Sequence, residues 1–253
     1  MKKAFFILFL FLFQLAKAQH ENYITLSTKL VEAIQLQHTS EVEAYINQIA
    51  TVDEAVLLKQ LNSDATKKTF FINLYNSLVI YALRKDPSLY QDRGSFFSTK
   101  RFKLAGNSIS LDNIEHDYLR HSSVKWGLGI FHKIFPSCLE KKLRVDKVDW
   151  RIHFSLNCGA KSCPPVFAYS LENIETEMKE SSKKYLEKNT TYNKEKKELF
   201  VPVLMSWFRN DFGNKRGVKR ICKEFNIIAE NDNPSISYNS YDWTLDINNF
   251  RKN

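Results

Sequence analysis

Residues 65–84 read ATKKTFFINLYNSLVIYALR, and this stretch decides the fold. Apolar side chains would fall on nearly every face of a helix built from it. A helix that is apolar nearly all round is normally buried, so we predict that this segment is the central helix of a globular core. Asp64 is the expected N-cap, and the pair Asp86-Pro87 is expected to stop the helix.

The polar exceptions on this helix are Asn73, Asn76 and Ser77, which share one stripe at spacings of three and four residues. Buried amides need hydrogen-bond partners. Two interpretations stay open: the stripe is a structural hydrogen-bond network, or it lines a polar site. On the second interpretation, Asn73 and Asn76 are candidate binding residues.

The composition of the chain is that of a globular protein. Of its 253 residues, 43% are apolar and 13% aromatic, which argues against disorder. Its 7 Gly and 6 Pro exclude a collagen-like or low-complexity chain. The formal charge is +9, but no nucleic-acid motif accompanies it, so we expect no nucleic-acid partner.

The N-terminus has the pattern of a secretory signal peptide. Residues 1–3 form a positive n-region, residues 4–15 an apolar h-region, and Ala16-Lys17-Ala18 fits a small-x-small cleavage site. Cleavage after Ala18 would leave 253 − 18 = 235 residues and, by removing three lysines, lower the charge from +9 to +6. An uncleaved anchor is the alternative, disfavoured because the apolar run is short. We therefore expect an exported bacterial protein, periplasmic or extracellular, with no stable membrane span.

Export would permit disulfides among the 4 Cys, and the positive charge would suit anionic envelope surfaces. The expected partner is a small-molecule or peptide-like envelope substrate of unknown identity. No Walker loop, dinucleotide fingerprint, HExxH or GxSxG motif occurs, so no cofactor is expected. The sequence gives no oligomeric state.

The remaining patterns predict one α+β domain, mostly helical, with a small antiparallel or mixed sheet. It would comprise residues 61–253, preceded by a lead-in of two or three short helices in residues 19–60. After the central helix we expect a loop over 91–107, a helix over 111–120 capped by Ser110, and a packed helix within 125–144 that ends at Pro136. The later elements expected are a strand at 151–157, an amphipathic helix at 170–188, a strand at 199–201, helices at 203–209 and 216–225, and a hairpin of 235–238 with 242–246.

Residues 151–165, RIHFSLNCGAKSCPP, carry the strongest indication of a site. Alternation along the expected strand would place His153, Ser155 and Asn157 on one face, directly before Cys158. A thiolate needs a nearby base or cation to form at neutral pH. The candidate bases are His153 and a second histidine, His116.

Residues 111–120 add an acid. Glu115 falls within the apolar arc of the predicted helix, and His116 lies at its edge. A carboxylate on a buried face must be paired or protonated. Glu115 is therefore a candidate functional residue, and a buried ion pair with Arg or Lys is the alternative. The aromatic cluster at 205–212, by contrast, is interpreted as packing with an ion pair of Arg209 and Asp211.

Three hypotheses for the cysteines stay open. In the first, Cys158 or Cys163 is a nucleophile, His153 or His116 its base, and Glu115 or Asn157 the orienting group, with backbone amides near Gly159 as an oxyanion hole. This would make the protein a thiol-dependent hydrolase or acyl transferase. In the second, Cys158 and Cys163 form a disulfide beside a polar pocket of a non-catalytic binding module, with Cys138 and Cys222 left over. In the third, the two Cys and two His bind Zn²⁺, although the C-x4-C spacing is loose. The candidate binding residues are Asn73, Asn76, Ser155 and Cys163.

Four ordered blocks of this chain carry a family resemblance. They are FINLYN at 71–76, SLDNIEH at 110–116, residues 151–164 and LMSWFRNDF at 204–212, and Tyr241-Asp242-Trp243 follows them. They resemble the motifs W-I-N-x-Y-N, S-L-x-x-I-E-H, R-I-H-F-x-L-N-C-G-x-x-S-C-P and L-S-W-F-x-x-D-F of domain of unknown function family 547. Phe71 and Met205 depart from the usual residues. The resemblance implies membership and no activity. Its motif positions include Asn73, Asn76, Glu115, His116, His153, Asn157, Cys158 and Cys163.

Overall fold

The chain folds around one long helix, α5 (Asp64–Lys85), in a computed structural model that describes residues 22–125 and 127–251. Every side chain from Thr66 to Ile80 is buried, which confirms the predicted central helix. It ends just before Asp86-Pro87, as predicted. The predicted N-cap is wrong by one residue, because Ser63 caps the helix through a reciprocal pair of hydrogen bonds with Thr66.

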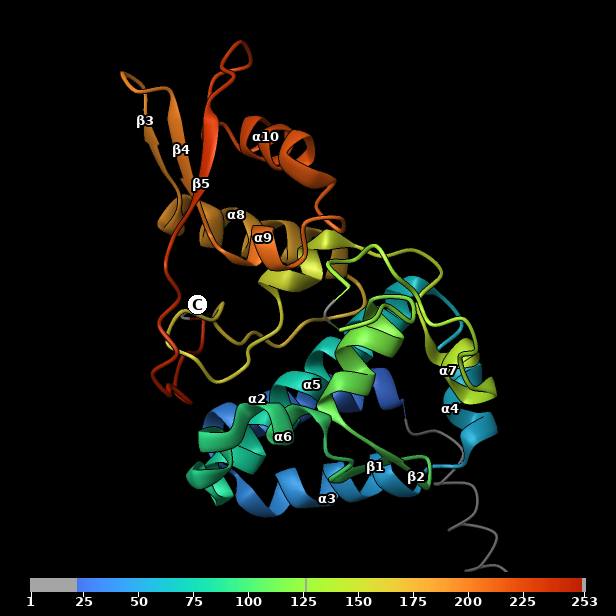
Figure 1. Cartoon of the computed structure of the whole chain (residues 1–253). Coiled ribbons are helices and arrows are strands. Elements are labelled where there is room, and N and C mark those ends of the chain that lie inside the picture. Colours follow the sequence, from blue (N-terminus) through green and yellow to red (C-terminus); the bar gives the residue numbers. More distant parts are fainter. Residues whose placement is uncertain (1–21, 126, 252–253) are drawn as a thin grey trace, which may run out of the picture.

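Short helices and one hairpin surround α5 in the first half of the chain (Figure 1). They are α2 (Tyr23–Leu36), α3 (Thr39–Thr51), α4 (Glu54–Gln60), the 3₁₀ helix η1 (Pro87–Asp92), α6 (Arg93–Ser98), β1 (Phe102–Leu104) and β2 (Asn107–Ile109). Helix α2 packs along α5, and three helices occupy the region where two or three were predicted. The predicted loop at 91–107 is wrong: Asp92 caps α6, Phe96 anchors it in the core, and β1 and β2 pair antiparallel.

The last part of the chain forms a second hydrophobic cluster with a three-stranded sheet, drawn in orange and red in Figure 1. Its elements are α8 (Ile174–Asn189), β3 (Thr191–Asn193), β4 (Glu198–Val201), α9 (Leu204–Trp207), α10 (Asn214–Glu224) and β5 (Ser235–Tyr238). Strand β4 pairs antiparallel with β3 and parallel with β5. The predicted closing hairpin is therefore wrong, because β5 pairs with β4, and Leu245 makes only an isolated bridge with Ala160.

The predicted strand at 151–157 is also wrong. Residues Trp150–Phe154 form a 3₁₀ helix, η3, which Asp149 caps by accepting a hydrogen bond from the Arg151 amide at 3.1 Å. The segment packs against α8 and contributes Ile152 to the first hydrophobic cluster and Phe154 to the second. The apolar alternation thus arises because successive side chains enter two different cores, and no sheet face is involved.

The packed helix predicted within 125–144 is absent from the described residues of that range before Pro136. Leu128 and Gly129 have φ of 56° and 80°, which breaks a helix there. The side chains of Ile130, Phe131, Ile134 and Phe135 are exposed instead of packed, and Trp126 lies outside the described residues. A helix, α7 (Cys138–Leu143), begins only after Pro136.

The fold is one mostly helical α+β domain with sheets of two and three strands, as the sequence predicts. The other long helix of that prediction, 170–188, corresponds to α8, although it begins later, at Ile174. Among residues 22–125 and 127–251, no helix combines the length and apolar character that crossing a bilayer requires.

Candidate functional site

A cavity of about 220 Å³ lies between α5, the segment from His153 to Pro164 and the C-terminal part of the chain. Its wall combines aromatic rings with titratable groups. The lining residues are Tyr75, Phe97, Asp112, Glu115, His116, Lys125, His153, Leu156, Cys158, Cys163, Pro164, Leu204, Trp207, Phe208, Tyr241 and Trp243. The cavity therefore brings together Cys158, Cys163, His153, His116 and Glu115, all predicted as site residues.

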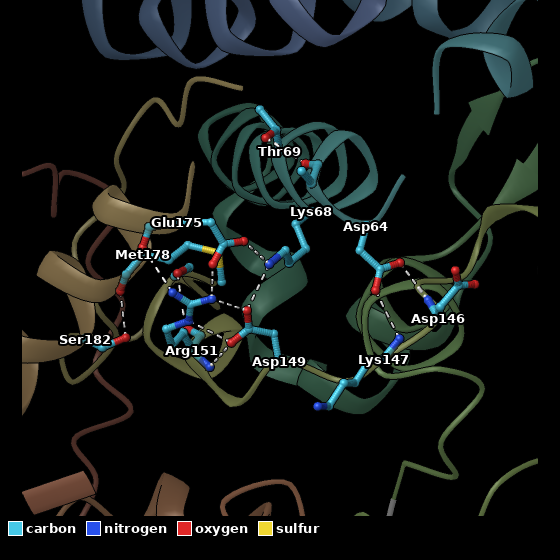
Figure 2. Close-up of polar contacts among 12 residues, drawn as sticks. Asp64, Lys68, Thr69, Asp146, Lys147, Asp149, Arg151, Glu175, Met178 and Ser182 are labelled. Atoms are coloured by element: carbon cyan, nitrogen blue, oxygen red, sulfur yellow. Dashed lines mark hydrogen bonds and ion pairs between the residues drawn. The ribbon is translucent and has the colours of Figure 1, made fainter. Parts of the chain in front are cut away.

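An ion-pair network fixes the segment that carries His153 (Figure 2). Lys68 of α5 contacts Asp149 Oδ2 at 2.9 Å, and the Arg151 guanidinium contacts the same carboxylate at 2.9 and 2.6 Å. Both cations also contact Glu175 of α8. Burial alone would raise the pKa of Asp149, but Arg151 and Lys68 lower it to about 2. The charged network thus ties η3 to both α5 and α8.

His153 is oriented by a carboxylate that the sequence analysis did not assign to the site. Its Nε2 lies 2.8 Å from Asp211 Oδ2, and both side chains are almost fully buried. Because an ionised carboxylate only accepts, Nε2 carries the proton and Nδ1 has the free lone pair. The ring stacks on Phe208 at 4.0 Å between centroids. Burial lowers the pKa of His153 against the opposing effect of Asp211, which favours a neutral ring.

Asp211 also pairs with Arg120, whose Nε lies 2.7 Å from the same Oδ2. Arg120 is completely buried and stacks over Phe208. The expected ion pair of Arg209 with Asp211 is wrong, because Arg120, 91 residues away, occupies that position. Asp211 belongs to the family-like block at 204–212, which could have marked it as a site residue. Nothing in the sequence indicated which groups its carboxylate contacts.

His116 has the same tautomer as His153, but its lone pair is already bonded. Arg120 donates a hydrogen bond to its Nδ1 at 3.0 Å, so Nε2 carries the proton, 3.8 Å from Asp112 Oδ1. Burial and then Arg120 lower the pKa of His116 to about 3, so the ring stays neutral at physiological pH. His116 is thus a hydrogen-bond donor with its lone pair already occupied, which disfavours it as a base.

The helix predicted at 111–120 is largely a π-helix, η2 (Asn113–Leu119). Such wide turns are rare overall, and those that occur often lie at functional sites. Glu115 on this helix accepts a hydrogen bond from the Tyr75 hydroxyl at 3.3 Å. In the described part of the chain it pairs with no Arg or Lys, so the alternative of a buried ion pair with a basic residue is wrong.

The two cysteines lie side by side as free thiols, with 2.7 Å between their sulfurs. The Tyr241 hydroxyl contacts the Cys158 sulfur at 3.5 Å and the Cys163 sulfur at 3.2 Å. A hydrogen bond from Cys163 lowers the pKa of Cys158 against the effect of burial, whereas burial raises the pKa of Cys163. Cys158 is therefore the sulfur that ionises first.

Four predicted site residues lie behind the cavity wall. Asn73 exchanges hydrogen bonds with the backbone of Tyr169 at 2.8 and 3.0 Å. Asn76 donates to the Ser155 carbonyl at 2.9 Å and accepts from the Asn157 amide at 2.8 Å. None of Asn73, Asn76, Ser155 and Asn157 lines the cavity, and all four are completely buried. The geometry favours the structural hydrogen-bond network over a polar binding stripe.

The expected oxyanion hole near Gly159 does not fit the geometry. The Gly159 amide donates to Asn157 Oδ1 at 2.8 Å, and the Cys158 amide donates to the Cys163 sulfur at 3.0 Å. Gly159 has a φ of 84°, and a Cβ there would approach Leu83 Cδ1 to 2.7 Å. Gly159 thus has a packing role. Within the described residues, no group of three or more His, Cys, Asp and Glu side chains is arranged to hold a metal ion, so nothing there favours the zinc hypothesis.

A family model described as "Protein of unknown function, DUF547" matches residues 58–186, just over half of the chain. The chain belongs to this family. The match includes the first three blocks recognised in the sequence, whereas residues 204–212 and 241–243 lie beyond it. No curated protein and no solved structure matches the chain.

Proposed function

We propose that this protein is a thiol-dependent hydrolase or acyl transferase, with Cys158 as nucleophile and His153 as general base. One observation carries the proposal: a cysteine whose pKa is lowered lines the same cavity as a histidine that a buried carboxylate orients. A nucleophile, a base and a group that orients the base are the parts that covalent acyl transfer needs.

In the proposed reaction, Nδ1 of His153 takes the thiol proton of Cys158, and the sulfur attacks an acyl carbon. The tetrahedral intermediate collapses when the protonated His153 returns that proton to the leaving group, which leaves a thioester on Cys158. Water then cleaves the thioester in a hydrolase, or a second nucleophile takes the acyl group in a transferase. Asp211 stabilises the imidazolium that forms transiently.

We assign the developing oxyanion to side-chain donors, because the amides of Cys158 and Gly159 are already used. The Nε2–H of His116 is one such donor on the cavity wall. A neutral histidine held in one tautomer can polarise a carbonyl without giving up its proton. Glu115 holds the Tyr75 hydroxyl and lines the same wall, which makes both of them binding residues in this proposal.

The alkylation rate of Cys158 tests the proposal. Under native conditions without reductant, iodoacetamide should modify Cys158 faster than Cys138, which is exposed and serves as an internal control. His153→Gln and Asp211→Asn should slow the reaction at Cys158 and leave the rate at Cys138 unchanged. A Cys158 rate no higher than that of Cys138 would overturn the proposal.

Acyl transfer is tested directly with p-nitrophenyl butyrate. The protein should release nitrophenol in a burst of one equivalent and carry a butyryl group on Cys158 in the intact mass. Cys158→Ala should abolish the burst, and Cys138→Ala should preserve it. A burst that survives Cys158→Ala would assign the activity to another residue.

A second candidate function is a binding module in which a Cys158–Cys163 disulfide stiffens the cavity wall. The 2.7 Å between the two sulfurs favours it, because they need to approach by less than about 1 Å to reach the disulfide length of about 2.05 Å. Protein purified without reductant would then be two hydrogens lighter, with Cys158 linked to Cys163 and neither alkylated. That result would make the binding module the leading proposal.

We further propose that the chain acts after export, once the leader at residues 1–18 is removed. Those residues lie outside the described part of the structure, so the support is their sequence pattern alone. N-terminal sequencing of protein recovered from outside the cytoplasm should begin at Gln19. An N-terminus that retains Met1 would contradict cleavage.

A further inference from the structure

The segment from Gly127 to Phe135 presents apolar side chains to solvent. Ile130 is 53% exposed, Phe131 62%, Ile134 84% and Phe135 92%. These four side chains lie within six consecutive positions, whereas single exposed apolar residues scattered over a surface need no explanation. We name this segment the apolar loop. In Figure 1 it belongs to the yellow-green chain that leads to α7.

Backbone hydrogen bonds hold the apolar loop in place. The Val124 amide donates to the Phe131 carbonyl at 2.9 Å, and the Lys133 amide donates to the Ser122 carbonyl at 2.8 Å. At the other side, Asn210 donates to the carbonyls of Leu128 and Gly129 at 3.1 and 2.8 Å. The loop therefore has a conformation that hydrogen bonds fix, and it projects from the rest of the fold.

Basic residues flank the apolar loop on two sides. Lys141 and Lys142 are exposed on α7, which follows the loop in the chain. On the other side, Asn210 bonds to the loop, and the exposed residues Arg209, Lys215 and Arg216 line one hollow next to it in the chain. An apolar projection with lysine and arginine beside it matches the interface of a bilayer that carries anionic headgroups.

We propose that the apolar loop docks this protein on an anionic lipid bilayer. Ile130, Phe131, Ile134 and Phe135 would insert between the headgroups, and the flanking basic residues would contact lipid phosphates. A second copy of the chain fits less well, because four such side chains expose only about 500 Å². Each partner in a standard protein interface buries ~800 Å².

Docking would also bring the cavity close to the membrane. Lys125, just before the loop, lines the cavity. Leu128 and Gly129 contact the residue that precedes Asp211. The inference is nevertheless independent of the thiol chemistry, because none of the four apolar residues lines the cavity.

Vesicle sedimentation tests the inference. The protein should begin at Gln19, because the apolar residues 4–15 would bind lipid themselves, and this form keeps every described residue. We expect it to sediment with vesicles of equimolar phosphatidylglycerol and phosphatidylcholine, and less with phosphatidylcholine alone. The double variant F131S/F135S should lower partitioning about 10-fold or more.

Matched control variants distinguish binding through the apolar loop from nonspecific hydrophobic or electrostatic binding to the vesicles. L36S/V56S removes two other exposed apolar side chains and should leave partitioning unchanged. K215Q/R216Q should weaken binding and its salt dependence, whereas K194Q/K196Q, in the turn between β3 and β4, should do neither.

Three results would overturn the inference. The first is no sedimentation with any vesicle, including the case in which the protein dimerises through the loop, seen by light scattering as a mass that F131S/F135S halves. The second is sedimentation that F131S/F135S does not reduce. The third is an equal loss in L36S/V56S.

Discussion

The segment that matches the family model and the segment beyond it supply different kinds of group to one cavity. Residues 58–186 contribute Cys158, His153, His116 and Glu115, which carry the candidate chemistry. The later segment contributes Asp211, which orients His153, and the aromatic wall around Tyr241. Reactive groups thus lie in the matched segment, whereas the carboxylate that orients His153 and part of the aromatic wall lie beyond it.

This difference shows that the segment covered by the family model does not complete the site on its own. Asp211 is 58 residues from His153 and 91 from Arg120 along the chain. Contacts over such separations depend on how the two hydrophobic clusters pack against each other. Four substitutions follow, three at contacts between the two segments and one at a contact within the matched segment.

Asp211→Ala should have the largest effect on stability. It leaves the completely buried Arg120 without its carboxylate, and removing one partner of a buried ion pair costs about 3–5 kcal/mol. Urea denaturation should show this loss in the free energy of unfolding. Asp242→Asn, at an exposed carboxylate 3.6 Å from Lys161, is the control and should leave the free energy of unfolding almost unchanged.

The same variant has a signature in pH. Burial would raise the pKa of Asp211, but His153 and Arg120 lower it to about 2. A carboxyl whose folded pKa lies below its unfolded value contributes stability above the unfolded value, near 3.9. That contribution is lost as the pH falls toward 2. Asp211→Ala should therefore flatten the pH dependence of unfolding in this acid range, and an unchanged slope would contradict the assignment.

Asn76→Ala tests a contact inside the matched segment. It leaves the Ser155 carbonyl and the Asn157 amide without partners in a fully buried place, which should cost about 2–4 kcal/mol. Asn62→Ala, at an exposed amide just before α5, should cost far less. If Asn76→Ala proved as mild as Asn62→Ala, the amide would not hold the 155–157 segment on α5.

Gly129→Ala tests a direct contact between the two segments. A Cβ at this position would lie 2.1 Å from Asp211 Oδ1, and the φ of 80° is strained for any L residue. We expect a loss of about 1–3 kcal/mol with slower alkylation of Cys158. Gly106→Ala, with φ of 76° and open space around it, isolates the cost of the backbone conformation. Equal losses in the two variants would show that contact with Asp211 is unimportant.

Tyr241→Phe should have the smallest effect. It removes the one hydroxyl of the later segment that we identify as lowering the pKa of Cys158. The midpoint of the alkylation rate against pH should rise by about one unit, equivalent to ~1.4 kcal/mol. Tyr238→Phe on β5 is the matched control. A midpoint that stays in place would assign the lowered pKa to Cys163 and the Ala160 amide.

Much of the helical framework was predictable from local patterns. The all-round apolar pattern of α5 and the breaker after it locate the central helix, because both act over one helix length. The strand predicted at 151–157 was wrong, because its alternating apolar side chains enter two different cores. The packed helix predicted within 125–144 was wrong, because the apolar residues at 130–135 are exposed to solvent. The periodicity of a sequence does not show whether its apolar residues are buried.

The candidate site divides in the same way. Cys158, His153, His116 and Glu115 were found because motif and polarity both mark them, and all four line the cavity. Asp211 was seen as part of an aromatic cluster and assigned the wrong partner. Asn157 was proposed as an orienting group, but its side-chain amide bonds to the backbone of Pro164 and Gly159 instead. The partner of Asp211 lies 91 residues away, and those of Asn157 lie in the turn that follows it, so a spacing pattern within a short segment determined neither contact.

The single oxygen of Asp211 that accepts from both Arg120 and His153 bears on where this protein can be divided. A fragment trimmed to residues 58–186 would keep every reactive side chain, yet its Arg120 would have no counter-ion and its His153 no fixed tautomer. Such a fragment would also lose α2, which packs along α5. The boundary that sequence comparison draws is thus not a boundary for expression, and a shortened chain should be designed to retain both α2 and residue 211.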